Sequence, residues 1–244
     1  MVINTNIAAL NAANDLNQSN TALNASLARL STGSQLVNAS DNPAGLAESI
    51  SLSAQIGQTN AANENIGNAQ SFLQTQDGYL QQVGAALDEM ASLAVEAQDG
   101  TISSSQLADY NSEFTALGSY ISDTAAKMFN GVSLFSNATL SVTTDGDGDS
   151  YSMTGVDLGK GLYSTAANAT LTSSVTAITA LQDVSAAISQ LGTDRAGVGA
   201  NEERLQYTSE ALSVLSTNLT SANSQTGESE PAKRAETHPE FIAG

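Results

Sequence analysis

The feature that most constrains this chain is an apolar seam between residues 66 and 97. Apolar or small side chains recur along it at alternating steps of three and four residues, namely Ile66, Ala69, Leu73, Leu80, Val83, Leu87, Met90, Ala94 and Ala97. Only Gln76 interrupts the series. This spacing, held for more than four heptads, predicts a long helix that must pack against other helices in a coiled coil. We therefore expect a protein whose work is assembly rather than catalysis.

Two further segments repeat the pattern. Residues 3–31 carry a stripe of Ile3, Ile7, Leu10, Ala13, Leu16, Leu23, Leu27 and Leu30. The asparagines between these positions lower helix propensity, so this helix is expected to need a partner. Residues 175–224 carry a second stripe of Ile178, Leu181, Val184, Ile188, Leu191, Val198, Leu205, Leu212, Leu215 and Leu219.

Residues that cap or break helices divide the chain into elements. Asp41 or Asn42 is expected to cap a helix that begins at Pro43 and ends near residue 98, before Asp99 and Gly100. A third helix, at 104–127, follows after so short a connection that it must fold back antiparallel. The fold class is therefore mainly α, a long antiparallel coiled-coil helical rod with a small β-hairpin.

The hairpin is expected within residues 138–158. Segments 139–142 and 151–154 alternate in polarity, and a turn rich in Asp and Gly lies between them. Residues 129–132 are expected to form a turn and residues 159–174 a loop. Residues 225–244 have no apolar period and are expected to be a disordered tail.

Charge and composition exclude several function classes. The net charge is −18, and no Lys or Arg lies between Arg29 and Lys127. Such a surface repels phosphate backbones, so no nucleic-acid partner is expected. No apolar run approaches the length of a membrane span, about 18 residues. The N-terminus lacks the features of a secretory signal peptide, so any export would use a route without signal-peptide cleavage.

Catalytic chemistry is also not expected. The only histidine, His238, lies in the tail, and there is no cysteine. The segment 145–149 (DGDGD) has the alternating carboxylates of a calcium loop, but the twelfth position, which needs a bidentate glutamate, is Val156. A hairpin turn explains this segment without a metal. We therefore expect no enzyme, no metal site and no cofactor.

Several motifs in order resemble bacterial flagellin, across about residues 2–224. They are residues 2–6 (VINTN), 27–33 (LARLSTG), 41–47 (DNPAGLA), 74–78 (QTQDG), 129–132 (FNGV) and 195–200 (RAGVGA). The resemblance implies a structural subunit of the extracellular flagellar filament, which supports motility by helix–helix self-assembly. The other partners it implies are filament or junction proteins of the flagellum. A hook–filament junction protein is a related alternative, although the VINTN opening fits flagellin better.

The resemblance also implies a domain plan. Residues 1–42 would be an inner-core helix and linker, and 43–174 the first part of a rod domain, with two helices, the hairpin and a short loop. Residues 175–224 would be the C-terminal helix of the rod, followed by the tail at 225–244. The residues implied in self-assembly and packing are Ile3, Ile7, Leu10, Leu27, Leu30, Leu73, Leu80, Leu87, Leu205 and Leu212.

Two departures from the family pattern affect the function. After residue 224 the sequence does not continue as the family's final amphipathic helix, which favours a second hypothesis: an assembly-incompetent, secreted or surface flagellin-like protein that binds a partner as a monomer. The segment that innate immune receptors recognise in the family is also degenerate here, so weak receptor activation is expected. Its remaining positions would be Glu89, Met90, Leu93 and Glu113.

Three charges in the last long helix admit two interpretations. Arg195 and Glu202 fall, by spacing, in the apolar seam, and Arg204 lies close by. Because lone charges are rarely buried, these side chains are either paired locally at the margin of the bundle or used in contacts between subunits.

Overall fold

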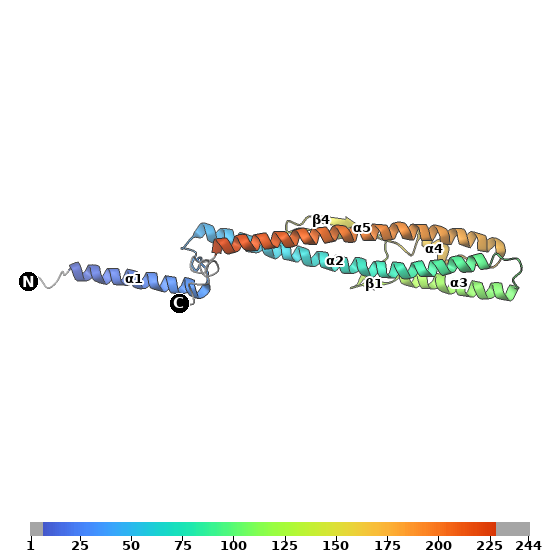
Figure 1. Ribbon diagram of the computed structural model, residues 1–244, viewed down its shortest axis with the longest axis horizontal. Helices are drawn as coiled ribbons and strands as arrows, with labels where there is room; N and C mark the ends of the chain where they lie inside the picture. Colours follow the sequence, from blue (N-terminus) through green and yellow to red (C-terminus); the bar gives the residue numbers. More distant parts are fainter. Residues whose placement is uncertain (1–6, 228–244) are drawn as a thin grey trace, which may run out of the picture. The chain divides into compact units, whose positions relative to one another are not determined.

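The computed structural model describes residues 7–227, and residues 1–6 and 228–244 lie outside the described part (Figure 1). Its elements are α1 (Ile7–Thr32), α2 (Pro43–Glu96), α3 (Ser104–Ala125), β1 (Met128–Phe129), β2 (Val132–Ser133), β3 (Leu140–Thr143), β4 (Ser150–Met153), α4 (Gly161–Ala167) and α5 (Ser174–Gly227). The chain divides into two compact units. One holds residues 60–213, and the other holds residues up to 59 together with those from 214 onward.

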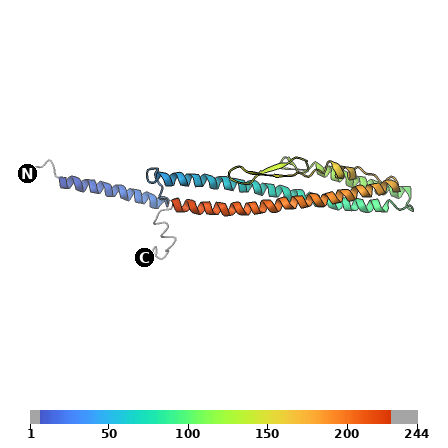
Figure 2. The ribbon, with the colours of Figure 1, turned by 90° about the horizontal axis from the view of Figure 1, so that it is seen from above.

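The unit of residues 60–213 is built on three helices that run side by side (Figure 2). α3 returns antiparallel to α2 after a short turn, and α5 runs antiparallel to α2. Their facing sides form one continuous apolar core, to which α3 contributes Phe114 and Ile121. The predicted mainly α fold with antiparallel coiled-coil helices and a small hairpin is confirmed.

The predicted seam of α2 faces this core. All nine of its apolar or small positions between residues 66 and 97 are buried. The one polar position, Gln76, is buried as well, and its side-chain amide donates to the backbone carbonyl of Leu134. The interruption in the apolar series therefore has a structural reason, because the buried Gln76 amide and the Leu134 carbonyl satisfy each other.

The helix boundaries follow local capping chemistry. Asn42 Oδ1 accepts a 3.0 Å hydrogen bond from the backbone N–H of Gly45, so Asn42 caps α2 as expected. α3 begins with a capping box, in which Ser103 and Gln106 each accept from the other's backbone N–H. α2 ends at Glu96, two residues earlier than the sequence predicts.

The predicted stripe of α5 is buried at Val184, Leu191, Val198, Leu205 and Leu212, but three predicted positions in the first half of the helix lie one residue past the buried ones. Its core positions in the first half are Ala177, Ala180, Val184 and Ala187, all buried. Ile178, which the predicted stripe included, is 45% exposed. Hydrophobicity alone favoured the larger side chains, whereas alanine at the seam lets the neighbouring helices approach closely.

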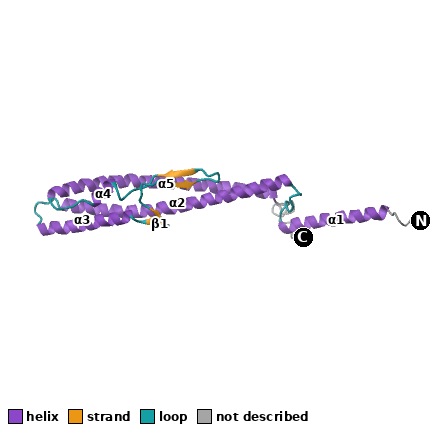
Figure 3. Cartoon of the chain, turned by 180° about the vertical axis from the view of Figure 1, so that it is seen from behind, coloured by secondary structure: helices purple, strands orange, loops and turns teal. Residues whose placement is uncertain are grey.

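Two hairpins lie over the helices (Figure 3). The expected turn at 129–132 is itself a minimal hairpin of β1 and β2, and both turn residues have positive φ, 48° at Asn130 and 80° at Gly131. Asn-Gly suits this turn because both residues tolerate the left-handed region. The second hairpin pairs β3 with β4 antiparallel, as predicted.

The segment 159–174 was expected to be a loop, and this prediction was wrong. It contains α4, a helix of seven residues whose Tyr163 and Ala166 are buried. The segment is rich in Gly, Ala, Ser and Thr and has no apolar period, so α4 owes its formation to packing against α3 rather than to its own propensity.

The second unit contains α1 and the outer ends of α2 and α5. Here the side chain of Asn223 accepts from Ser49 Oγ at 2.7 Å and donates to Ser53 Oγ at 3.2 Å, which ties α5 to α2. α5 continues to Gly227, so residues 225–227 of the expected tail are helical. None of the described helices is long and apolar enough to cross a membrane.

Candidate assembly surfaces

The residues predicted to act in assembly fall into two structural groups. Five of them, Leu73, Leu80, Leu87, Leu205 and Leu212, are buried in the core of the chain's own helical bundle. Four of them, Ile7, Leu10, Leu27 and Leu30, lie on α1 and are 54–67% exposed. Ile3 lies outside the described residues. Only the α1 group is therefore free to contact another chain.

The predicted receptor residues also divide. Glu89 and Glu113 are exposed, on α2 and α3. Met90 and Leu93 are buried in the core. The four residues therefore do not form one accessible surface, and the expectation is corrected for Met90 and Leu93.

Arg195 is paired within the chain. Its Nε lies 2.8 Å from Asp77 Oδ1 and a terminal nitrogen lies 3.2 Å from Asp77 Oδ2, which is a bidentate ion pair between α5 and α2. The hydrogen bond from Arg195 is the main reason that the pKa of Asp77 lies below its usual value. The true register of α5 places Arg195 beside the seam, not in it, which explains how the charge is tolerated.

The ion pair predicts a pH-dependent contribution to stability. Because the pKa of Asp77 is lowered by folding, the contribution is fully present above the ordinary aspartate pKa of about 4 and is lost as the pH falls through the lowered value. A double-mutant cycle of Asp77→Asn and Arg195→Ala, measured by urea unfolding, should give a coupling of about 0.2–1 kcal/mol at pH 7, since the pair is partly exposed. A coupling that stayed constant down to pH 2 would contradict this assignment.

The other two charges also have partners in the same unit. Glu202 accepts a 3.0 Å hydrogen bond from the amide of Gln74. The guanidinium carbon of Arg204 lies 3.8 Å from the centroid of the Tyr151 ring, a cation–π contact between α5 and β4. Arg195, Glu202 and Arg204 are therefore paired locally within the chain, as the first of the two interpretations of these charges predicts.

Two tyrosines anchor the segment that covers the bundle, and sequence reasoning missed them. Tyr151 donates from its hydroxyl to Asn201 Oδ1, and Tyr163 donates to Asp194 Oδ2 at 2.7 Å. Asp194 and Asn201 alternate along α5 with the buried positions Leu191, Val198 and Leu205. Burial raises the pKa of Tyr163, and its bond to Asp194 raises it further. The sequence did contain a signal for these contacts, because Asp194 and Asn201 are polar residues seven positions apart within the apolar stripe of α5.

The acidic loop forms a turn closed by its own side chain. Asp145 Oδ1 accepts from the backbone N–H of Asp147 at 3.0 Å and of Asp149 at 2.8 Å. Val156, at the twelfth position of the would-be calcium loop, is buried. No cluster of three or more metal-ligating side chains occurs among residues 7–227.

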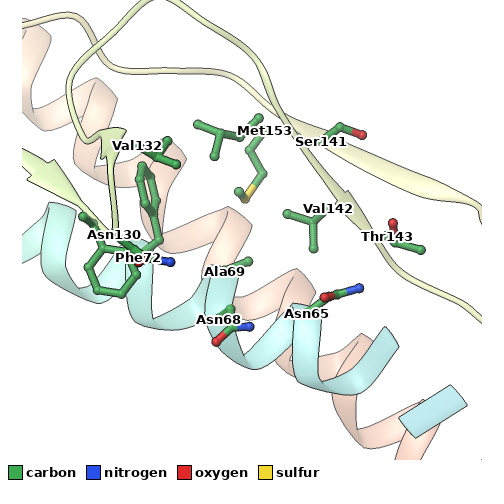
Figure 4. Close-up of a pocket in the computed structure, with 12 residues that line it drawn as sticks. Asn65, Asn68, Ala69, Phe72, Asn130, Val132, Ser141, Val142, Thr143 and Met153 are labelled. Carbon is green, nitrogen blue, oxygen red and sulfur yellow. The ribbon is translucent and has the colours of Figure 1, made fainter. Parts of the chain in front are cut away.

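A shallow cavity of about 350 Å³ opens between α2 and the two hairpins (Figure 4). Val142 and Met153 reach from the second hairpin toward Ala69 and Phe72 on α2. The Phe72 ring packs edge-on against Phe129, with 6.0 Å between centroids. All twelve lining residues are uncharged. This lining offers contacts to neutral groups and contains no acid, base or nucleophile in a catalytic arrangement.

Comparisons with known proteins agree with this architecture. The profile of the family described as "Bacterial flagellin N-terminal helical region" matches residues 3–139. The chain is 40% identical to the B-type flagellin of Pseudomonas aeruginosa over 48% of its own length and 24% of that protein. It is 30% identical to the flagellin of Bacillus subtilis, over 96% of its own length and 89% of that protein.

Among solved structures, the flagellin of Bacillus cereus superposes with a TM-score of 0.57 at 26% identity, over 66% of this chain and 94% of that one. The chain spans about a quarter of the length of the Pseudomonas protein and nearly nine-tenths of the Bacillus subtilis protein.

Proposed function

The chain belongs to the bacterial flagellin family, and from this premise we propose that it is a structural subunit of the flagellar filament. It would assemble by helix–helix contacts with further copies and so support motility. The observation that carries the proposal is the exposed apolar stripe on α1, whereas the leucines of the α2 seam are already buried within the chain. An apolar helix face of this kind favours association with another helix.

The domain plan is part of the proposal. Residues 1–42 would form the inner-core helix and linker, and residues 43–174 and 175–224 would form the rod. The working contacts would be those of α1, at Ile7, Leu10, Leu27 and Leu30. The buried leucines of the seam would act indirectly, by keeping the rod rigid.

The setting and chemistry follow from the same premise. We place the chain outside the cell, in the flagellum, after export without a cleaved signal peptide. Its partners would be copies of itself and other filament or junction proteins. Flagellins are structural proteins, and we propose no catalytic role. Receptor activation is proposed to be weak, because two of the four predicted positions, Met90 and Leu93, are buried and only Glu89 and Glu113 are exposed.

A second candidate function is a monomeric binding protein that does not polymerise. It is favoured by residues 225–244, whose sequence has no apolar period to pair with the α1 stripe. Under this hypothesis the α1 stripe would contact a partner other than a filament neighbour.

Polymerisation decides between the two functions. We expect the purified chain to form sedimentable filaments, seen by negative-stain microscopy, with or without filament seeds. Replacing Leu27 and Leu30 together by serine should abolish assembly, because it removes two exposed apolar contacts of about 1.5–3 kcal/mol each. The matched control is Gln18→Ala, on the same helix but away from the stripe.

The outcomes are distinct. Assembly of the double variant at the wild-type level would reject α1 as the assembly surface. A wild-type chain that stays monomeric even with seeds would support the binding-protein hypothesis instead.

A further inference from the structure

α5 carries a polar stripe beside its apolar seam. In the unit of residues 60–213, the polar stripe has three members at intervals of seven residues, so they lie on one side of the helix. Each member contacts a polar side chain of α2, in the pairs Arg195–Asp77, Glu202–Gln74 and Ser209–Asn63. The last of these is a 2.7 Å hydrogen bond from Ser209 Oγ to Asn63 Oδ1.

The first and last pairs share one antiparallel register. From Arg195 to Ser209, α5 advances by 14 residues, and from Asp77 to Asn63, α2 goes back by 14 residues. The polar contacts therefore hold the same alignment of the two helices over two heptads.

The apolar seam by itself distinguishes this register only weakly from a displaced one. Both helices bury branched apolar side chains at intervals of seven, namely Val184, Leu191, Val198, Leu205 and Leu212 on α5 and Ile66, Leu73, Leu80 and Leu87 on α2. A slide of α5 by one heptad, about 10.5 Å along the axis, would bring each such side chain to the place of another. Most apolar contacts would then be replaced by similar ones.

The polar stripe separates these alignments clearly. A slide of one heptad in one direction would bring Asp77 level with Glu202, so that two carboxylates oppose each other. A slide in the other direction would bring Asp77 level with Ile188. In both cases Arg195 loses its carboxylate partner. Charge pairs at the margin of a coiled coil add little to stability, but they select the alignment of the helices.

We propose that the polar stripe sets the axial register of α5 on α2, whereas the apolar seam supplies most of the stability. The register matters beyond the two helices, because α5 also holds the hydroxyls of Tyr151 and Tyr163 and so fixes where the covering segment lies. The inference goes beyond the proposed function and does not rest on it, since every residue involved lies in the unit of residues 60–213.

A competition between two disulfides measures the register, because the chain has no cysteine. The reporter is the full chain with Asn63→Cys, Gln70→Cys and Ser209→Cys. Position 209 meets position 63 in the register described above, and it meets position 70 after the slide that opposes the two carboxylates. Positions 63 and 70 are about 10.5 Å apart along α2, beyond the roughly 7 Å that a disulfide can span between Cα atoms.

The reporter is refolded from urea with reduced and oxidised glutathione. Oxidised glutathione takes up the two thiol hydrogens and is itself reduced. Digestion at Glu64 separates positions 63 and 70, so mass spectrometry gives the share of each disulfide. We expect the 63–209 disulfide to dominate. Asp77→Ala should raise the share of the 70–209 disulfide by at least about threefold, because it removes a charge pair from one register and a like-charge contact from the other.

The size of the effect should depend on which partner is removed. Arg195→Ala should raise the 70–209 share less than Asp77→Ala does, because Asp77 would still oppose Glu202 in the displaced register. Asp77→Asn, which keeps the shape of the side chain, is a second variant and should act like Asp77→Ala. Asp77→Glu keeps the charge and should restore the share of the parent reporter.

Glu210→Ala is the matched control. It also removes one carboxylate from α5, but Glu210 accepts its 3.1 Å hydrogen bond from Gln206 of the same helix, so the disulfide shares should not change. A 70–209 share that Asp77→Ala and Asp77→Asn leave unchanged would overturn the proposal. An equal rise with Glu210→Ala, or a larger rise with Arg195→Ala than with Asp77→Ala, would also overturn it.

Discussion

Replacing Gly118 by alanine is expected to lower the free energy of unfolding by about 1–3 kcal/mol. Gly118 lies on the buried side of α3, where the chain passes beneath the end of α4. A Cβ at this position would stand 2.2 Å from the carbonyl oxygen of Ala167 and 3.0 Å from its carbonyl carbon. Both are backbone atoms, so α4 would have to move away from α3 as a whole.

Gly192 in α5 is the matched control, because it is also a helical glycine. A Cβ there has no neighbour within 4 Å. Gly192→Ala should therefore raise the free energy of unfolding by about 0.5–1 kcal/mol through lower backbone entropy in the unfolded state. Urea unfolding followed by circular dichroism gives both values. Shifts of the same sign would show that the packing of α4 on α3 is not as described.

Replacing Leu80 by alanine is expected to cost about 2–5 kcal/mol of unfolding free energy. Leu80 is fully buried at the seam of α2, where it faces the other helices of the bundle. The loss combines the transfer free energy of the side chain with the cavity that rigid neighbouring helices leave open. Thermal and urea unfolding at low protein concentration measure it.

Leu10→Ala makes the same chemical change where the side chain is 64% exposed. It should alter the unfolding free energy by no more than about 0.5 kcal/mol, because no core is disturbed. An effect as large as that of Leu80→Ala would mean that α1 packs within the monomer. The pair thus separates the leucines that hold the fold from those proposed to hold the assembly.

The sequence predicts the α2 seam correctly because a helix of that length samples the apolar period many times. The errors at α4 and in α5 have different causes. The sequence of α4 has no apolar period, and the helix is stabilised by packing against α3, so no local pattern predicts it. In α5, positions 178, 181 and 188 were predicted in place of the buried Ala177, Ala180 and Ala187, because a pattern of large apolar side chains does not single out alanine as a seam residue.

The candidate surfaces show the same division. Ile7, Leu10, Leu27 and Leu30 on α1 are exposed, and their part in assembly stays a prediction. The partners of Arg195, Glu202 and Arg204 could not be deduced. Arg195 reaches across 118 residues of chain to Asp77, and spacing along one helix carries no information about the residue opposite.

By itself the sequence determined the helical class, the main helix boundaries, the principal hairpin and the family, since capping residues, turn residues and apolar periods act within a few neighbouring positions. Tertiary structure decided which residues in the first half of α5 are buried and where α4 forms. It also decided which tyrosine hydroxyl donates a hydrogen bond to Asp194 and which to Asn201. Those outcomes depend on side chains distant in sequence meeting at close range. They are set by close packing and by the need of buried polar groups for hydrogen-bond partners, and no single segment can meet either requirement alone.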